Sequence, residues 1–280
     1  MYEMKNIDQK TVESFGDEWS TFDQSSISDD EACKRFNEYF SVFPWEELPQ
    51  GAEGFDMGCG SGRWARFVAP KVGRLHCIDP SSAIEVAKEN LSANKNVSFH
   101  KSSLDSNCLP QKSQDFGYSL GVLHHVPNPV AAIRSCVDLL KPGAPLLLYL
   151  YYSFDNRPWW YRIIWRVSDF ARRIIYRLPP FLKRIITEII ALLVYVPLTT
   201  FSRLMEKLGF NVTSFPLSYY RNYSFYTMRT DARDRFGTPL EHRFSRKQIT
   251  EMMQGAGLED VHFSDTAPLL VCCRNKGQIM

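Results

Sequence analysis

Three glycines alternate with small residues in the segment Gly58–Gly62, directly after a strand-like run that contains Asp56. Glycine permits positive φ and lets a ligand lie against bare backbone, and the N-terminus of a following helix offers free N–H groups. The loop therefore predicts a site for a nucleotide-like ligand. Its third glycine comes one place too early for the dinucleotide fingerprint, and no Lys-Ser/Thr pair follows, so a triphosphate site has little support.

Two further groups could do chemistry beside this loop. Asp79 closes the run RLHCIDP, 21 residues after Gly58, where a carboxylate can accept both hydroxyls of a ribose. It could equally cap the next helix, and the two roles can coexist. His124 and His125 follow a strand-like run at the edge where parallel sheets bind ligands, and a histidine there can take a proton near neutral pH. We prefer His125 as this base; the alternative is that both only pack or hydrogen-bond the loop.

The elements that must position these residues alternate regularly between residues 52 and 151. Short β-rich runs are followed by helix-like ones, a pattern typical of a parallel sheet covered by helices. The alternation stops after Tyr152 and resumes near residue 244. We therefore expect an N-terminal helical extension over 1–50, one α/β domain formed by 51–152 and 244–280, and a helical insertion over 153–243.

Composition limits the class of protein. The chain has 280 residues, 44% of them hydrophobic, and a net charge of +2, which favours a folded protein and gives no overall signal for nucleic acid. Its seven cysteines form no CxxC pair and no zinc-like spacing, so we expect no metal and a reducing, cytoplasmic compartment. The N-terminus lacks the apolar core of a signal peptide, and the most apolar run, 185–198, is short, so we expect no membrane span.

The glycine loop is one of several motifs that occur in a fixed order. DMGCGSG is followed by LHCIDPS with Asp79, then HKSSL, LGVLHHVPNP and LLKPGAPLLLY. As a set these resemble the class I S-adenosylmethionine-dependent methyltransferases, and LHHV followed by LKPG is similar to their small-molecule branch, which includes quinone, sterol and sugar methyltransferases. The resemblance covers roughly 50–152 and 244–275. It implies an α/β, Rossmann-like sheet flanked by helices, with a helical cap inserted after the fifth strand.

The same resemblance implies S-adenosyl-L-methionine as the cofactor and assigns residues to its parts. Asp56, Gly58 and Gly60, with Cys59 between them, would surround the methionine portion. The ribose would be held by Asp79 and flanked by Pro80 and Ser81. Ser103, which stands where an acid is often found in the family, would border the adenine together with Leu104. The side facing the sulfonium would be lined by Leu120 and Gly121.

The insertion carries a basic amphipathic segment. Arginines recur at steps of 4, 7, 4 and 7 between Arg162 and Arg184, beside an apolar series from Ile163 to Leu178, and Pro179-Pro180 interrupts the helix. Such a helix can lie on an anionic membrane, which predicts peripheral contact through 157–184. The alternative is a lid helix that packs its apolar face on the α/β domain.

Residues 218–236 interleave tyrosines with arginines. The guanidinium group of arginine can donate two parallel hydrogen bonds to a phosphate or carboxylate group. We therefore expect this segment to close an acceptor pocket. The candidate acceptor-binding residues are Tyr223, Arg221, Arg229 and Arg233, with Tyr151 and Tyr152 at the end of the fifth strand. A structural salt-bridge network with Asp231 and Asp234 is the alternative. Trp19 in the N-terminal extension could cover the cofactor or simply anchor the first helix.

The function predicted from these features is methyl transfer to a small-molecule acceptor, either lipid-like (prenyl or quinone) or phosphorylated. A sugar or glycan intermediate and C-methylation of a prenyl diphosphate are the alternatives within this reaction. Two other classes stay open: a cofactor-binding module without turnover, and a peripheral membrane protein anchored by the basic helix. No nucleic-acid partner is expected.

Overall fold

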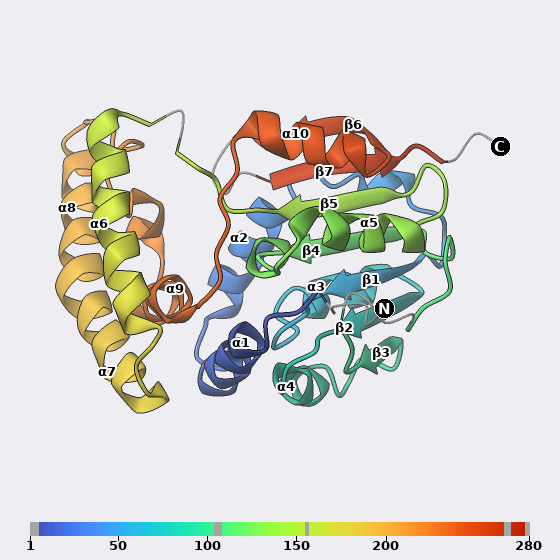
Figure 1. Cartoon of the computed structure of the whole chain (residues 1–280), viewed down its shortest axis with the longest axis horizontal. Coiled ribbons are helices and arrows are strands. Elements are labelled where there is room, and N and C mark those ends of the chain that lie inside the picture. Colours follow the sequence, from blue (N-terminus) through green and yellow to red (C-terminus); the bar gives the residue numbers. More distant parts are fainter. Residues whose placement is uncertain (1–5, 104–107, 155–156, 266–269, 278–280) are drawn as a thin grey trace. The chain divides into compact units, whose positions relative to one another are not determined.

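The computed structural model describes residues 6–103, 108–154, 157–265 and 270–277. It falls into two compact units (Figure 1). The first, here named the sheet unit, comprises 1–23, 33–153 and 240–280. The second, named the helical unit, comprises 24–32 and 154–239. The first 50 residues, expected to form an extension, are thus divided between the two units.

The sheet unit is built on one seven-stranded sheet, which confirms the predicted α/β fold. The strands follow the order β3-β2-β1-β4-β5-β7-β6, in which β1 to β5 pair in parallel and β7 runs antiparallel to both of its neighbours. They are β1 (Glu53–Met57), β2 (Arg74–Ile78), β3 (Val97–His100), β4 (Phe116–Leu120), β5 (Pro145–Tyr149), β6 (Leu258–Phe263) and β7 (Leu270–Asn275).

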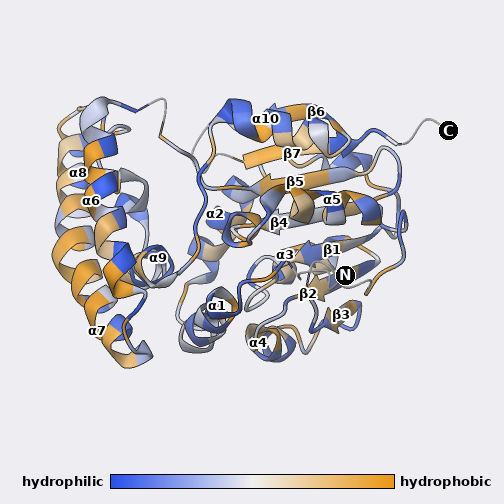
Figure 2. Cartoon of the chain, viewed as in Figure 1, coloured by the Kyte–Doolittle hydropathy of each residue, from blue (hydrophilic) through white to orange (hydrophobic). Residues whose placement is uncertain are grey.

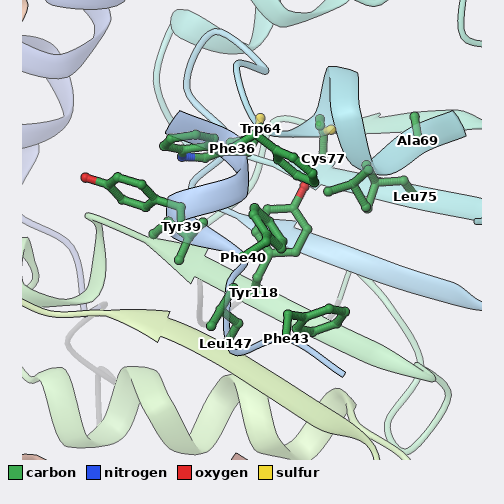
Figure 3. Close-up of a cluster of buried hydrophobic side chains, with 14 of the residues drawn as sticks. Phe36, Tyr39, Phe40, Phe43, Trp64, Ala69, Leu75, Cys77, Tyr118 and Leu147 are labelled. Carbon is green, nitrogen blue, oxygen red and sulfur yellow. The ribbon is translucent and has the colours of Figure 1, made fainter. Parts of the chain in front are cut away.

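Both faces of this sheet are buried, as the apolar strands require. On one face, α2 (Asp29–Tyr39), α3 (Ala65–Val68) and α4 (Ala83–Asn90) contribute to an aromatic-rich cluster with Leu147 of β5. Figure 3 shows Phe36, Phe40 and Phe43 gathered around Tyr118 of β4. Alternate residues of a strand point to opposite faces, so a central parallel strand must be apolar throughout.

The other face is covered by α5 (Pro129–Leu139) and α10 (Arg246–Gly255), which bury Leu146 and Leu148 of β5. Capping side chains mark the first turn of both helices. Asn128 caps α5 by accepting a hydrogen bond from Ala131 N at 3.1 Å. Ser245 and Gln248 form a reciprocal capping box at α10.

Helix α1 (Gln9–Thr21) packs on α4 in the sheet unit. Its Gly16 lies so close to α4 that a Cβ there would meet Oγ of Ser82 at 2.6 Å. This glycine therefore serves close helix approach rather than a turn, and it fixes α1 beside the second strand-to-helix connection.

The helical unit contains α6 (Trp159–Ile175), α7 (Pro180–Ile190), a π-helical turn η4 (Ala191–Tyr195), α8 (Val196–Lys207), η5 (Ser218–Asn222) and α9 (Phe225–Gly237). The predicted interruption at Pro179-Pro180 is confirmed, because α7 begins at Pro180. The prediction that the most apolar run is too short to span a membrane is wrong in its premise. That run belongs to one continuous helix, Pro180–Lys207, with 28 residues and a mean hydropathy of 1.8 in its most apolar window, which is sufficient by length and composition.

Candidate functional site

The glycine loop lies between β1 and α3 at the carboxyl end of the sheet. Gly58, Gly60 and Gly62 all adopt positive φ, at 78°, 55° and 77°. Gly58 also donates a 2.7 Å hydrogen bond to the carbonyl of Ile78, which ties the loop to β2. A Cβ at Gly58 would meet Val122 at 2.5 Å, so the loop passes close to the segment that follows β4.

Asp79 fixes the loop from the end of β2. Its Oδ2 accepts a hydrogen bond from Gly60 N at 2.9 Å, and its Oδ1 accepts two from Ser81, from the backbone N at 2.8 Å and from Oγ at 2.6 Å. A carboxylate has about four lone-pair positions, so acceptor capacity remains on Oδ2. Asp79 thus joins the two neighbouring strand ends and keeps an acceptor for a ligand.

Asp56 of β1 is buried beneath this loop. Its Oδ2 has no hydrogen-bonding partner among the described residues. Burial raises its pKa to about 8; the Tyr118 hydroxyl lowers it, Asp79 raises it and Arg63 lowers it, each by less. A buried carboxyl without a partner is costly in a finished protein, and a cationic or hydrogen-bonding ligand would satisfy it.

The two histidines form a short 3-10 turn, η3 (Leu123–His125), after β4, and both are buried. Nδ1 of His125 lies 2.6 Å from the carbonyl of Leu240, which can only accept, so this nitrogen donates. The His124 ring stacks on Tyr151 with ring centroids 3.8 Å apart. Burial lowers the pKa of His124 well below its usual value, aided by the charges of His125, Arg243 and His242 and opposed by a backbone contact from Tyr149.

Residues 55–148 match the family model described as "Methyltransferase domain". These residues, about a third of the chain, therefore form a methyltransferase domain. The ubiquinone biosynthesis O-methyltransferases of Nitrosospira multiformis and Xanthomonas axonopodis pv. citri are both 34% identical to it, over 111 and 103 residues. These matches cover 38% and 36% of this chain but only 44% and 43% of the relatives, so the chain spans less than half of their length.

Solved structures agree on the fold of the methyltransferase domain. An S-adenosylmethionine-dependent methyltransferase of Methanosarcina mazei superposes with a TM-score of 0.50 at 18% identity, covering 85% of this chain and 99% of that one. The S-adenosylmethionine-dependent methyltransferase SibL gives 0.50 at 14% identity, covering 87% of this chain and 55% of that one. Identities this low show the fold alone.

The residues of the methyltransferase domain fit S-adenosylmethionine. The unpartnered buried oxygen of Asp56, the bare backbone of Gly58–Gly62 and the remaining acceptor of Asp79 lie around one loop. Of the other predicted cofactor contacts, Pro80 and Ser81 follow Asp79, and Leu120 and Gly121 end β4. Ser103 follows the end of β3, and Leu104 lies outside the described residues.

Cys59, the remaining predicted cofactor contact, lies inside the loop as a buried thiol. Burial raises its pKa well above the usual value, followed by a hydrogen bond and charge coupling to Cys77. A thiol of this kind stays protonated and acts as a small packing group rather than as a nucleophile.

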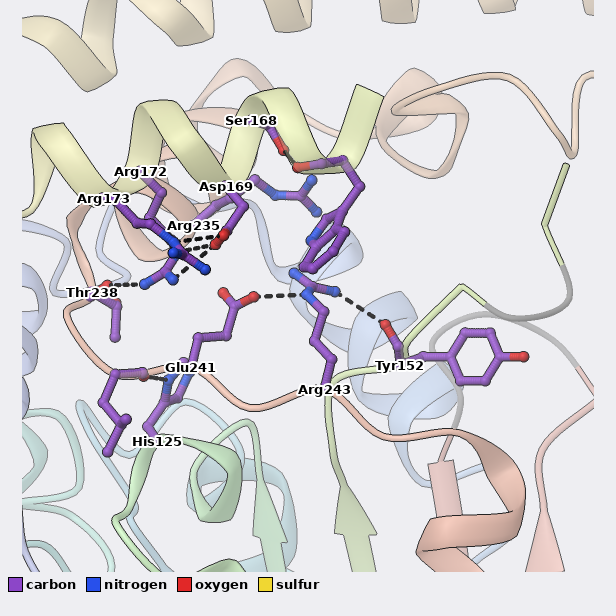
Figure 4. Close-up of polar contacts among 12 residues, drawn as sticks. His125, Tyr152, Ser168, Asp169, Arg172, Arg173, Arg235, Thr238, Glu241 and Arg243 are labelled. Carbon is purple, nitrogen blue, oxygen red and sulfur yellow. Dashed lines mark hydrogen bonds and ion pairs between the residues drawn. The ribbon is translucent and has the colours of Figure 1, made fainter. Parts of the chain in front are cut away.

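A charged pair that the sequence patterns did not reveal lies beside Tyr151. The Arg243 guanidinium lies over the Tyr151 ring at 4.9 Å and pairs with Glu241 at 2.7 Å. It also donates to the carbonyl of Tyr152 at 3.2 Å (Figure 4). The only sequence signal was the charged stretch EHR at 241–243, just before the predicted domain boundary.

Trp19 of α1 lies against the glycine loop of the methyltransferase domain. A Cβ at Gly60 would meet Nε1 of Trp19 at 3.1 Å, and the Arg63 guanidinium stacks on the Trp19 ring at 4.8 Å. The N-terminal segment therefore packs against the loop, and the expectation that Trp19 covers the cofactor stays a prediction.

The other predicted acceptor residues belong to the helical unit and have partners there. Arg229 pairs with Glu188 at 2.5 Å, and Arg221 pairs with Glu206 at 2.5 Å. Arg233 is buried in α9, and Tyr223 is buried with its ring 5.2 Å from that of Tyr219. The arginine partners are thus mainly glutamates of α7 and α8, rather than the aspartates considered from the sequence.

Proposed function

We propose that the whole chain is an S-adenosylmethionine-dependent methyltransferase that acts on a small-molecule acceptor, lipid-like or phosphorylated. The observation that carries this proposal is the glycine loop held by the Gly60–Asp79 hydrogen bond, which directly follows the strand that buries Asp56 Oδ2 without a partner among the described residues. The family match and the relatives support it.

Bound S-adenosylmethionine would supply an electrophilic methyl group on a sulfonium sulfur. Asp56 and the backbone of Gly58–Gly60 would hold the methionine portion, and Asp79 would orient the ribose. Positioning and exclusion of water supply much of the rate in such a displacement, and Trp19 over the loop serves this role.

We propose His124 or His125 as the group that takes the acceptor proton where the acceptor is a hydroxyl. The lowered pKa of His124 keeps its ring neutral, but the same burial disfavours the protonated ring that a base must form, which favours His125 of the two. The Nδ1 donation of His125 to Leu240 leaves Nε2 as the basic nitrogen of the neutral ring.

A lipid-like acceptor is favoured over a sugar or a prenyl diphosphate because the relatives are named for ubiquinone biosynthesis and because the helical unit exposes a large apolar surface. The residues that we propose for acceptor binding are Tyr223, Arg221, Arg229, Arg233, Tyr151 and Tyr152. We place the reaction in the cytoplasm, with peripheral contact to the inner membrane face through 157–184.

Calorimetric titration of the full chain with S-adenosylhomocysteine tests the cofactor assignment. Micromolar binding is expected, and a folded chain that shows none would overturn the assignment. Methyl transfer is then measured with radiolabelled cofactor and three acceptors: a short-tailed catechol precursor of a quinone, a nucleotide sugar and a prenyl diphosphate. Labelling of the catechol alone supports the lipid-like acceptor, whereas labelling of either other compound selects that alternative. If the chain binds the cofactor but labels no compound in a broader panel of acceptors, a cofactor-binding module without turnover is favoured.

A further inference from the structure

The helical unit exposes large hydrophobic side chains along its long helices. In the described part of the chain, every large hydrophobic side chain that is markedly exposed belongs to this unit. On α6, Trp159, Ile163, Val167, Phe170 and Ile174 recur at helical spacing and are 49–68% exposed. Figure 2 shows hydrophobic residues along α7 and α8 as well. Among the exposed ones are Phe181 of α7, Leu193 of η4 and Phe201 of α8. A monomer in water rarely carries such a surface without a partner.

Several polar side chains of the Pro180–Lys207 helix are buried, whereas Arg203, Glu206 and Lys207 near its end are exposed. Lys183, Thr187, Thr199 and Ser202 follow at helical spacing along the Pro180–Lys207 helix, and all are less than 9% exposed. Globular helices normally bury the apolar stripe and solvate the polar one. Here the unit buries one apolar cluster, which includes Ile175, Met228 and Phe236, and still leaves a second apolar stripe exposed, which indicates that the medium outside this stripe is apolar.

The inward polar face has satisfied partners on α9. Glu188 pairs with Arg229 at 2.5 Å, and the Tyr195 hydroxyl donates to Asp231 at 2.5 Å. On α6, Asp169 pairs with Arg172 and Arg173, and Arg172 also donates to the carbonyl of Thr238 at 3.0 Å (Figure 4). These inward polar groups therefore have partners within the unit, although the Ser202 hydroxyl has none among the described residues, and the exposed apolar stripe is the surface that this unit leaves uncovered.

Charge identifies the kind of apolar medium. Arg162, Arg166 and Arg177 are exposed beside the α6 stripe, whereas the acidic side chains of α6 and α7, Asp169 and Glu188, are only 11% and 29% exposed and bind arginines. An isologous contact with a second copy would bring these arginine rows together. An anionic lipid surface would instead pair the arginines with headgroups and accept the apolar side chains.

We propose that the outward faces of α6 and of the Pro180–Lys207 helix dock into the interface of an anionic lipid bilayer. The Pro180–Lys207 helix lies in the membrane plane rather than across the bilayer. Spanning would pull it away from α9 and leave Arg229 and Asp231 without Glu188 and Tyr195. This docking surface extends well beyond 157–184 and does not depend on methyl transfer.

Flotation of the full chain with vesicles tests the proposal. Vesicles of phosphatidylcholine are compared with vesicles containing a third phosphatidylglycerol. Binding is expected to be roughly tenfold or more tighter to the anionic vesicles and to weaken at high salt, as about 1 kcal/mol per arginine near the surface implies. Bound protein is expected to leave the vesicles on alkaline carbonate extraction, which does not release a spanning helix, and to stay accessible to protease added outside.

Two variants separate the apolar and electrostatic parts. Ile163→Gln/Val167→Gln/Phe170→Gln alters only exposed side chains, and Arg162→Glu/Arg166→Glu reverses two charges. Each is expected to reduce vesicle binding at least tenfold with an unchanged thermal midpoint and unchanged S-adenosylhomocysteine binding. The matched control, Lys95→Glu/Lys112→Glu, makes the same charge change at exposed positions of the sheet unit and is expected to bind vesicles nearly as the parent does.

Three outcomes overturn the proposal. One is a folded parent chain that binds no vesicle; another is equal vesicle binding by the parent and the triple glutamine variant. The third is a dimer by light scattering that the same glutamine substitutions dissociate, without vesicle binding, which would assign the face to a second copy. Loss of S-adenosylhomocysteine binding with intact vesicle binding would contradict the proposed function and leave the docking surface standing.

Discussion

The backbone N–H of Gly60 donates a 2.9 Å hydrogen bond to Oδ2 of Asp79, so the glycine loop and the end of β2 hold one another in place. Asp79→Asn replaces an ionised acceptor with a neutral amide. Hydrogen bonds to charged groups contribute about 1.5–3 kcal/mol, so S-adenosylhomocysteine affinity is expected to fall roughly 10- to 100-fold by calorimetry. Asp138→Asn on the exposed part of α5 is the control. Equal affinity in both variants would remove Asp79 from the site.

Asp56 makes stability and binding depend on pH. Its pKa is about 8 in the folded protein, against an ordinary aspartate value of 3.8 in the unfolded chain. Between about pH 4 and pH 8 the unfolded chain therefore ionises while the folded one keeps its proton. Stability without ligand should fall as pH rises through this range, by at most about 1.4 kcal/mol per pH unit. Asp56→Asn should flatten that slope in urea titrations. An unchanged slope would contradict the shifted pKa.

Binding of a cationic ligand should ionise Asp56 and release a proton. Calorimetry of S-adenosylhomocysteine at pH 7 in two buffers of different ionisation enthalpy measures that proton directly. The parent chain is expected to release it and Asp56→Asn is not. Identical heats in both buffers for the parent would count against a carboxylate–ammonium contact at this position.

His124 acts on stability at lower pH. Its pKa is lower in the folded protein than the usual 6.5, so the unfolded chain binds a proton first as pH falls below about 6.5. Stability is then fully present above that pH and declines below it. His124→Phe keeps a ring against Tyr151 and removes the titration, so it should lessen the decline. The exposed His262→Gln variant of β6 is the control and should retain it.

Gly58 should tolerate no side chain, for a reason that can be separated from backbone strain. A Cβ there would lie 2.5 Å from Val122, whereas Gly143 has nearly the same φ, 79° against 78°, with nothing within 4 Å. Gly58→Ala is therefore expected to cost roughly 1–3 kcal/mol more than Gly143→Ala in chemical denaturation. Adding Val122→Ala should recover much of the difference. If the two alanine variants are equally stable, the predicted clash is absent.

Exchanging the charges of Arg229 and Glu188 distinguishes a structural role of Arg229 from a role in binding the acceptor. Both side chains are about 30% exposed, so Arg229→Glu should destabilise the fold by only about 1 kcal/mol, and the swap with Glu188→Arg should restore the thermal midpoint. Arg229 as an acceptor ligand would leave the KM for a charged acceptor raised in the swapped variant. Recovery of both quantities would make the arginine purely structural.

Local sequence patterns were sufficient to predict the strands and the glycine loop of the methyltransferase domain. Alternating β-rich and helix-like runs located all five parallel strands, because a buried parallel strand such as Pro145–Tyr149 must be apolar throughout. The glycine loop and Asp79 were recognisable because positive φ and a carboxylate at the neighbouring strand end leave direct marks in sequence. Arg243 and Glu241 were missed, since they reach Tyr151 only through the return of the chain to the sheet.

The helical unit shows the limit of periodicity. Spacing alone determined that 159–175 forms a basic amphipathic helix, because side chains three or four apart share a helix face. It could not determine which face points inward, since water and lipid select opposite faces of the same helix. Only the tertiary structure decided this: Arg172 of this helix is buried and donates to the carbonyl of Thr238 at 3.0 Å, which leaves the apolar stripe from Trp159 to Ile174 exposed.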